Sequence, residues 1–388
     1  MAKRRGKHRS SVNITIVLIV IVVVAALLLL DYFGVISLPF QNPLRALFQK
    51  TDETDDSPDV VVSGDLQIHF IELGNKYTGD CTYIKVGKDM DILIDAGSKT
   101  SSISTIESYV DKYCTDGTLE YVIVTHAHED HYAGFAGDGK NESIFKHYKC
   151  ETIIDFSQTN QKETATMYSN YQKSLAAEIA EGATHYTASE VRQSGEYVFK
   201  LTETGSITLE ILDSYYYYHK DSSGENNHSV CCMINKGDEH YLFTGDLEKK
   251  GEEQLVQLNK LPEVELFKAG HHGSKTSTNE VLLSVIKPKI VCVCCCAGSG
   301  QYTNVDNNDN TFPTQAFIDR VAPYTSRVYV TTICDDFTTD ATVKSMNGNI
   351  IVFSASDGVH VKCSNNNLKL KDTEWFKKHR VCPGAWSD

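Results

Sequence analysis

The densest group of metal-binding side chains lies in Thr125-His126-Ala127-His128-Glu129-Asp130-His131, directly after the apolar stretch YVIVT. Three imidazoles and two carboxylates in six residues are unsuited to core packing, because every buried polar group would need a partner. His126 and His128, two residues apart on extended backbone, can direct both rings at one ion. Asp130 and His131 follow a turn and can serve a second ion. Since zinc-like metals accept imidazole and carboxylate ligands, the motif predicts a site for two divalent ions.

Three further stretches follow the same rule, in which a short apolar segment, typical of a strand, leads to a potential ligand. DILIDAG contains Asp95, YLFTGD ends in Asp246, and LFKAGHH ends in His271 and His272. Alone, Asp95 or Asp246 would be an ordinary turn or cap residue. Together, the four strand ends predict one site, in which Asp95 orients a ligand histidine and the two oxygens of Asp246 bridge the ions.

The segment after the late histidines predicts an anion site. Gly273-Ser274-Lys275-Thr276 leads into an expected helix, and Ser277–Glu280 has the pattern of a capping box. Free amides at the helix start, with Lys275 nearby, would bind an anion and favour a phosphate-bearing substrate; an ordinary capped turn is the alternative. Asn227, Ser274 and Lys275 are the candidate substrate contacts. Tyr215–Tyr218 is expected to be either a cleft wall or a packed edge strand.

The elements that must position these side chains are strands interleaved with helices, followed by a late hairpin. This order favours an α/β (α+β) body with mixed sheets. The expected strands are 66–72, 81–86, 91–95, 121–125, 207–212, 229–234, 241–244, 264–268, 290–296 and 328–332, with a hairpin over 349–363. The expected helices are 103–113, 165–182, 248–258 and one near 314–321.

The N-terminal region predicts a membrane anchor. Residues 14–30 form an apolar run whose only polar residue is Thr15, and as a helix this run would be about 26 Å long, close to the minimum for a bilayer span. The basic residues before it predict that the N-terminus lies inside and the body outside. A cleaved signal peptide and a buried helix are the alternatives. Residues 13–33 are therefore assigned to one transmembrane signal anchor in the cell membrane.

The remaining boundaries follow from composition. Residues 1–12 form a basic cytoplasmic tail, 34–63 an acidic linker, 64–365 the extracytoplasmic domain and 366–388 a C-terminal tail. The mean hydropathy of −0.28 excludes a polytopic membrane protein. The chain has 37 Lys and Arg against 51 Asp and Glu, and five of the cations lie in the first twelve residues. The acidic remainder argues against a broad grip on nucleic acid, although a local anion site at metal ions is compatible with it.

The twelve cysteines do not suggest a disulfide framework. Cys292, Cys294, Cys295 and Cys296 lie in one apolar run, and Cys231 and Cys232 lie in another. Such residues act as small hydrophobic side chains of buried strands. Disulfide pairing stays open for the scattered cysteines, which are Cys81, Cys114, Cys150, Cys334, Cys363 and Cys382.

HxHxDH, a later Gly-Asp and a late histidine after a strand resemble the pattern of the metallo-β-lactamase superfamily. The resemblance covers residues 66–363 and is strongest to the hydrolase domain of the DNA-uptake competence protein ComEC and its stand-alone relatives. It rests on LQIHFIELG, ILIDAG, THAHEDHYAG, NNHSV, LFTGDLE, LFKAGHHGSKTST, NTFPTQAFIDRV and NGNIIVFSASDG. It implies an αββα sandwich with a metal pair at the rim between two sheets.

The resemblance also implies the ligand set. His126 and His128 would hold the first metal, Asp130 and His131 the second, with Asp246 bridging and either His271 or His272 completing the second site. The superfamily generally adds a third histidine to the first site, where this chain reads ENNHSV. His228 is either that ligand or a residue lining the cleft, and an amide oxygen of Asn226 or Asn227, or water, could take the place. The expected cofactor is two Zn²⁺ ions, with Mn²⁺ or another divalent metal as alternatives.

The predicted function is a membrane-anchored, extracytoplasmic hydrolase that cleaves phosphodiesters in nucleic acid or a cell-surface polymer. A hydroxide bridging two metals would attack the substrate, and Asp130, Asp246 and His272 would form the catalytic set. The alternatives are a lactonase or β-lactamase and a non-catalytic competence-associated surface module. The expected partners are the membrane and a phosphate-bearing substrate, and no obligate protein partner is evident.

Overall fold

The computed structural model of the chain describes residues 64–299, 311–334 and 342–387. The predicted cytoplasmic tail, anchor and linker, residues 1–63, lie outside the described residues. Among the residues that the structure describes, none of the helices combines the length and the apolar composition that a bilayer span requires.

The first sheet has the order β16-β15-β1-β2-β3-β4-β5-β6. Strands β3 to β6 run parallel to one another, and the other neighbours pair antiparallel. The strands are β1 (Leu66–Phe70), β2 (Thr82–Val86), β3 (Met90–Ile94), β4 (Thr118–Ile123), β5 (Lys149–Asp155), β6 (Thr184–Thr187), β15 (Ile350–Ala355) and β16 (Gly358–Cys363).

The second sheet has the order β14-β13-β12-β11-β10-β9-β8-β7, with β10 to β13 parallel. Its strands are β7 (Val198–Lys200), β8 (Ile207–Ile211), β9 (Cys232–Lys236), β10 (Glu239–Phe243), β11 (Leu266–Lys268), β12 (Ile290–Ala297), β13 (Val328–Cys334) and β14 (Val343–Ser345). In both sheets the parallel strands carry the predicted site residues, so their loops meet at the same edge.

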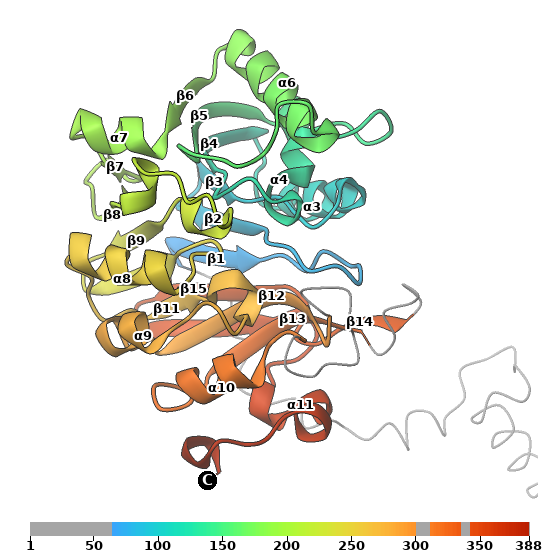
Figure 1. Cartoon of the computed structure of the whole chain (residues 1–388), viewed down its shortest axis with the longest axis vertical. Coiled ribbons are helices and arrows are strands. Elements are labelled where there is room, and N and C mark those ends of the chain that lie inside the picture. Colours follow the sequence, from blue (N-terminus) through green and yellow to red (C-terminus); the bar gives the residue numbers. More distant parts are fainter. Residues whose placement is uncertain (1–63, 300–310, 335–341, 388) are drawn as a thin grey trace, which may run out of the picture. The chain divides into compact units, whose positions relative to one another are not determined.

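Helices cover the outer faces of both sheets, which gives the predicted order of helix, sheet, sheet and helix (Figure 1). Helices α3 (Ile103–Val110), α4 (Glu129–Ala136) and α6 (Thr166–Glu181) pack on the first sheet. Helices α8 (Lys249–Leu258), α9 (Glu280–Ile286), α10 (Gln315–Val321) and α11 (Glu374–His379) pack on the second. The other α-helices of the described residues are α5 (Ile144–His147) and α7 (Ala188–Ser194).

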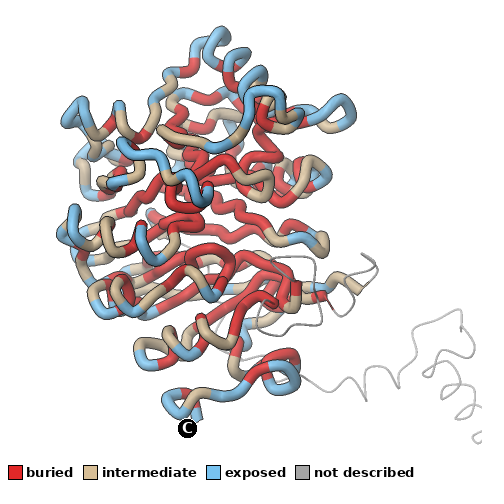
Figure 2. Tube along the Cα trace, in the orientation of Figure 1, coloured by how far each residue is buried: buried red, intermediate tan, exposed pale blue. Residues whose placement is uncertain are grey.

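Strand β12 shows why the cysteine-rich run is apolar. Cys292 and Cys294 belong to the core that includes residues of both sheets, whereas Val293 and Cys295 belong to the core under α10 and α11. A strand buried on both faces needs a continuous run of apolar side chains, and Figure 2 shows such burial along the central strands. All twelve cysteines are free, and only Cys382 is exposed. The prediction that the clustered cysteines act as buried hydrophobic residues is confirmed.

The segment expected to be a C-terminal tail, residues 366–388, is folded over its described part. Leu370, Trp375, Phe376 and Trp386 are buried in the same core as Phe317 of α10. The Arg380 guanidinium donates hydrogen bonds to the carbonyl oxygens of Pro313 and Thr311, both at 2.9 Å. The large aromatic side chains supply enough apolar area to hold this short segment against β12 and β13.

Candidate metal centre

The predicted site residues come together at the edge where the parallel strands of both sheets end. Asp95 follows β3, and His126 and His128 follow β4, with His128 at the N-cap of α4. From the second sheet, Asp246 follows β10, and His271 and His272 follow β11. Two sets of side chains therefore face each other, one from each half of the sandwich.

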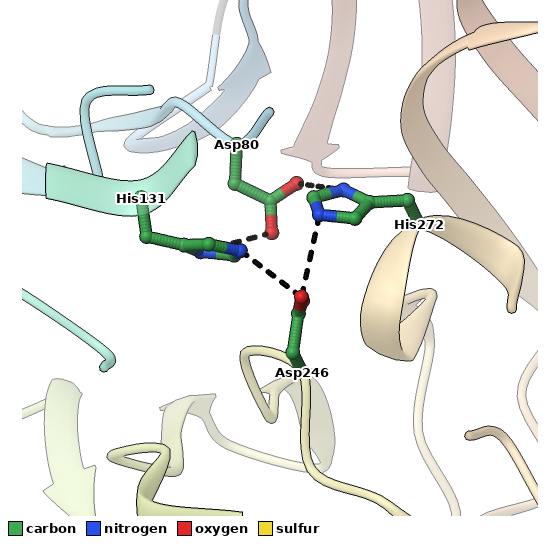
Figure 3. Close-up of side chains that lie close together, drawn as sticks. All are labelled: Asp80, His131, Asp246 and His272. Atoms are coloured by element: carbon green, nitrogen blue, oxygen red, sulfur yellow. Dashed lines mark ion pairs between the residues drawn. The ribbon is translucent and has the colours of Figure 1, made fainter. Parts of the chain in front are cut away.

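Asp246 lies between the histidines of the two sets. Its Oδ2 atom is 3.1 Å from His131 Nε2 and 3.3 Å from His272 Nε2 (Figure 3). The Nε2 atoms of His271 and His126 are 3.8 and 3.9 Å from the same oxygen. His131 Nε2, His272 Nε2 and Asp246 Oδ1 are buried and make no hydrogen bond with the described residues. Converging nitrogen and oxygen lone pairs of this kind fit a divalent cation.

Hydrogen bonds fix the direction of the two histidines closest to Asp246. His131 Nδ1 is 2.8 Å from Asp95 Oδ2, so Asp95 has the orienting geometry expected of it. Asp95 is itself held by the backbone N–H and the hydroxyl of Thr125, both at 2.7 Å. His272 Nδ1 donates to the carbonyl oxygen of Cys294 at 2.9 Å. Both rings consequently turn Nε2 toward Asp246.

Asp130 joins the same group from the surface side. Its Oδ2 atom is 3.3 Å from His272 Nε2, and its side chain is 35% exposed. Asp130, His131, His272 and Asp246 therefore lie together, as expected of the second site. His272 Nε2 lies closer to Asp246 Oδ2 than His271 Nε2 does, at 3.3 Å against 3.8 Å, which favours His272 as the late ligand.

The first-site pair is also assembled. His126 Nε2 lies 3.0 Å from His128 Nδ1. The other nitrogen of His126 lies 3.2 Å from the Thr125 hydroxyl and 3.4 Å from the Ser229 hydroxyl. Burial lowers the pKa of His126 well below its ordinary value, which favours the neutral imidazole that metals bind.

The centre of the cluster has strongly coupled charges. Burial alone would lower the pKa of His131, but Asp246 and Asp95 outweigh it and hold that pKa well above its usual value. Burial would raise the pKa of Asp246, whereas the charges of His131, His272 and His271 keep it well below its usual value. The Asp246 carboxylate thus stays ionised in a buried place, which is the electrostatic setting for a cation.

The loop that carries His271 and His272 has an unusual backbone conformation, which hydrogen bonds from neighbouring residues stabilise. His271 and His272 have φ values of 47° and 55°, in the left-handed region that such side chains rarely adopt. Arg320 of α10 donates hydrogen bonds to the carbonyl oxygens of Ser274, Lys275, Ser277 and Thr278. The buried Glu252 carboxylate accepts from the backbone N–H groups of Thr278 and Asn279.

This arrangement corrects the prediction of an anion site at the helix start. The N-cap of α9 is Asn279, with no side-chain capping hydrogen bond, so the capping box at 277–280 is absent. Glu252 already accepts from the amides that an anion would use. The Ser274 side chain is buried and bonds within its own turn, to Thr276. Lys275 is exposed. The Ser274 hydroxyl thus has a structural role in its turn, and its contact with a substrate stays a prediction.

The region ENNHSV differs from its prediction as well. His228 Nε2 accepts from the backbone N–H of Asp221 at 2.9 Å, and its Nδ1 lies 3.4 Å from Glu225 Oε1. Both ring nitrogens thus serve the 221–228 loop, and the structure does not bring His228 into the cluster as a ligand. Asn227 is likewise occupied, because its amide oxygen accepts from Glu248 N and its amide nitrogen donates to Asp221. Asn227 thus has a structural role in this loop, and its contact with a substrate stays a prediction.

Asn226 is the residue of this region whose amide oxygen stays available. Asn226 Oδ1 is buried and makes no hydrogen bond with the described residues. Its amide nitrogen lies 3.4 Å from His271 Nδ1, next to the cluster. Nearby, Tyr215–Tyr217 form a short 3-10 helix rather than an edge strand. Tyr217 is buried and accepts a hydrogen bond from Cys231 N, while Tyr215 and Tyr218 are exposed.

Sequence reasoning missed Asp80 and Lys268. Asp80 lies in the loop between β1 and β2, and together with His131, Asp246 and His272 it places ligand-type atoms within 4.8 Å of one another. Lys268, the last residue of β11, is buried and forms an ion pair with Asp80. The signals were the charged residue at the end of LFK and the Gly-Asp pair before β2.

A model of the metallo-beta-lactamase superfamily matches residues 74–297. Among curated proteins, ComE operon protein 3 of Bacillus subtilis is 26% identical over 173 residues, which are 44% of this chain and 19% of that protein. Recombination protein 2 of Haemophilus influenzae is 33% identical over 108 residues, which are 28% of this chain and 12% of that protein. The chain thus spans about a fifth or less of the length of these relatives.

Two solved structures show lower similarity. The metallo-beta-lactamase fold protein YhfI of Bacillus subtilis has 12% identity and a TM-score of 0.38, with 69% of this chain and 96% of that chain covered. The short form of human tRNase Z has 10% identity and a TM-score of 0.32, with 69% and 93% covered.

Proposed function

The chain belongs to the metallo-beta-lactamase superfamily and is a metal-dependent hydrolase, and from this premise we propose that it is a membrane-anchored phosphodiesterase with a two-metal centre. The observation that carries the proposal is the position of Asp246, whose one oxygen lies within 3.1 to 3.9 Å of four imidazole nitrogens. A carboxylate in this position is suited to bridge two ions.

The residues fit a pair of ions because buried lone pairs of His131 Nε2, His272 Nε2 and Asp246 Oδ1 converge, and the described residues offer these atoms no hydrogen bond. In the proposed assignment, Asp130, His131 and His272 hold one ion, His126 and His128 hold the other, and Asp246 touches both. The orphaned oxygen of Asn226 supports it as the further ligand that stands in for a third histidine. Two Zn²⁺ ions are proposed, since the donors are imidazole and carboxylate, and Mn²⁺ would accept the same set.

Bound divalent ions would supply a water of lowered pKa and would clamp the attacking and leaving oxygens of an in-line displacement. The chain's own residues prepare that site. Cys294 O holds His272 Nδ1, and Asp95 holds His131 Nδ1. The Nε2 atom of each ring therefore keeps its direction. Asp130 is the carboxylate of the ligand set that reaches solvent, and we assign it the role of accepting a proton from the attacking water.

The proposed substrate is a phosphodiester in nucleic acid or in a phosphate-bearing cell-surface polymer. Support comes from the chemistry of a two-metal clamp and from relatives named for the comE operon and for recombination. A role in competence is proposed on the same similarity. The excess of 51 acidic over 37 basic residues favours substrates that bind through the metal centre over those held by a wide basic surface.

The proposed location is the cell membrane, with residues 13–33 as a single-pass anchor and the catalytic body outside. Support comes from the apolar run at 14–30 and the basic residues before it. The membrane and the phosphate-bearing substrate are the proposed partners.

Assays of the full chain against three substrates test this function. We expect metal-dependent hydrolysis of bis-p-nitrophenyl phosphate, suppressed by a chelator and restored by Zn²⁺ or Mn²⁺, and a comparison with single-stranded DNA tests nucleic acid as the natural substrate. Turnover of nitrocefin alone would instead indicate a β-lactamase-type hydrolase. A metal-loaded chain inactive on every substrate would contradict the proposal.

A further inference from the structure

Lys268 is a charged residue inside the sandwich, beside the metal centre. Its side chain is 4% exposed, and its ammonium forms an ion pair with Asp80 Oδ2. The same ammonium lies 3.4 Å from the carbonyl oxygen of Gly245, the residue before Asp246. A buried ion pair is costly to desolvate and survives where its geometry is well satisfied. The burial of Lys268 at this position therefore indicates a role in the neighbouring site.

Asp80 lies on the far side of both histidine rings from Asp246. Asp80 Oδ1 is 3.3 Å from His272 Nδ1, and Asp80 Oδ2 is 3.7 Å from His131 Nδ1 (Figure 3). The opposite nitrogen of each ring faces Asp246. Each ring thus lies between Asp80 on its Nδ1 side and Asp246 on its Nε2 side. Asp80 adds a negative charge beside the Nδ1 contacts that Asp95 makes with His131 and Cys294 O makes with His272.

Asp80 also connects the two halves of the sandwich. It belongs to the β1–β2 loop of the first sheet, where its backbone N–H donates to the carbonyl oxygen of Asp130 at 3.1 Å. Its carboxylate contacts His272 and Lys268, which both belong to the second sheet. One residue therefore ties the backbone of one ligand, Asp130, to the side chain of another, His272.

Resting on the proposed two-metal function, we propose that Asp80, paired with Lys268, is a positioning residue that orients His272 and His131 toward the second metal. Lys268 pairs with Asp80 Oδ2, and His272 Nδ1 lies 3.3 Å from Asp80 Oδ1, so both carboxylate oxygens face charged or ring groups of the protein. In this proposal Asp80 therefore acts through the histidines instead of binding the ion. Groups that hold a ligand histidine commonly change metal affinity by about 10- to 100-fold when removed. Lys268, through Gly245 O, extends the same restraint to Asp246.

Cobalt titration of the full chain tests this assignment, with visible absorption as the readout of the ligand field. We expect the wild-type chain to bind two Co²⁺ ions. Asp80→Ala and Lys268→Met should each weaken one of the two binding steps by about 10- to 100-fold and alter the absorption bands of that ion. The paired change Asp80→Asn with Lys268→Met removes both charges and keeps a side-chain oxygen beside His272 Nδ1, so it should recover much of the affinity.

The buried pair Lys85–Asp91 of the first sheet is the matched control, since its side chains are 10% and 0% exposed. Lys85→Met should lower stability and leave cobalt binding unchanged. If either single variant at the site fails to fold, two uncharged pairs carry the test, Asp80→Asn with Lys268→Met and Asp80→Leu with Lys268→Met. Only the first keeps a side-chain oxygen beside His272 Nδ1, so only the first should keep wild-type-like bands and affinity.

Two results would overturn the assignment alone: wild-type cobalt affinities and spectra in Asp80→Ala and Lys268→Met, or an equal loss of affinity in Lys85→Met. Loss of cobalt binding in the pair with Asp80→Asn would also contradict it. A wild-type chain that binds no cobalt would overturn the proposed metal centre, and the assignment with it.

Discussion

Asp246 Oδ2 lies 3.1 Å from His131 Nε2, although Asp246 follows a strand of the second sheet and His131 lies in the first turn of α4, above the first sheet. The contact joins the two halves of the sandwich at the point where both have their strand ends. A metal centre here depends on how the two sheets are placed relative to each other. A substitution can therefore act by removing a ligand or by shifting that placement.

His272 and His271 should differ in their effect on the metal content. His272 Nε2 lies 3.3 Å from both Asp130 and Asp246, whereas His271 Nε2 is 3.8 Å from Asp246. We expect His272→Ala to remove one of two ions and lower phosphodiester hydrolysis by roughly 100-fold or more. His271→Ala should cause a smaller loss. Elemental analysis beside steady-state rates checks this, and the reverse order would assign the late ligand to His271.

His228 should matter for stability and not for metal binding. Its ring is fully buried and both nitrogens serve the 221–228 loop. His228→Ala leaves the N–H of Asp221 without its acceptor, which should lower the free energy of unfolding by about 1–3 kcal/mol. Urea denaturation measures this change while elemental analysis follows the metal content. A variant of normal stability that holds one ion instead of two would show that His228 is a ligand.

Gly97 should tolerate no side chain. A Cβ atom there would lie 1.5 Å from the carbonyl oxygen of Asp130, a backbone atom at the start of α4. Gly97→Ala must therefore displace Asp130 and His131, and we expect loss of metal with a lowered melting temperature. Gly139→Ala is the control, because nothing lies within 4 Å of the added atom. Normal metal content in Gly97→Ala would refute the close packing of these loops.

Glu252 should give the stability a pH dependence. Burial raises its pKa to about 7 from 4.5, despite the hydrogen bonds it accepts from Thr278 and Asn279. The folded chain thus holds the proton more tightly than the unfolded chain, so this contribution is complete below pH 4.5 and is lost as the pH rises through about 7. The change amounts to about 3 kcal/mol.

Glu252→Gln stays neutral and provides the comparison. The free energy of unfolding of the wild type relative to this variant should fall by about 3 kcal/mol between pH 4.5 and pH 8. Urea denaturation in the presence of a chelator measures it without a contribution from bound metal. A difference between the two chains that does not change with pH would contradict the raised pKa.

The fold and the centre of the site could be predicted because they follow from local patterns. Asp95, His126 and Asp246 each come directly after an apolar strand, and ends of parallel strands meet at one edge. Strand β6, THYT, was missed because it is an edge strand with alternating exposed and half-buried residues and few apolar ones. Strand β5 and helix α7 next to it were missed with it.

Other site residues depend on contacts that spacing does not encode. His228 has a suitable distance in sequence from Asp246, but the Asp221 N–H and Glu225 hold its ring inside the loop. Asp80 follows a turn between antiparallel strands, where no strand end marks it. Lys268 lies in an apolar run, and only its partner across the sandwich explains why a charge is buried there.

Metal content and phosphodiester hydrolysis of Asp246→Ala, measured together on the full chain, show whether Asp246 joins two metal ions that carry out the reaction. Asp357→Ala is the control, since Asp357 is 74% exposed. We predict two divalent ions and turnover of bis-p-nitrophenyl phosphate for the wild type and the control. Asp246→Ala should lose at least one ion and roughly 100-fold or more of the rate. A wild-type chain without bound metal, or an Asp246→Ala variant that keeps both ions and its rate, would contradict the account.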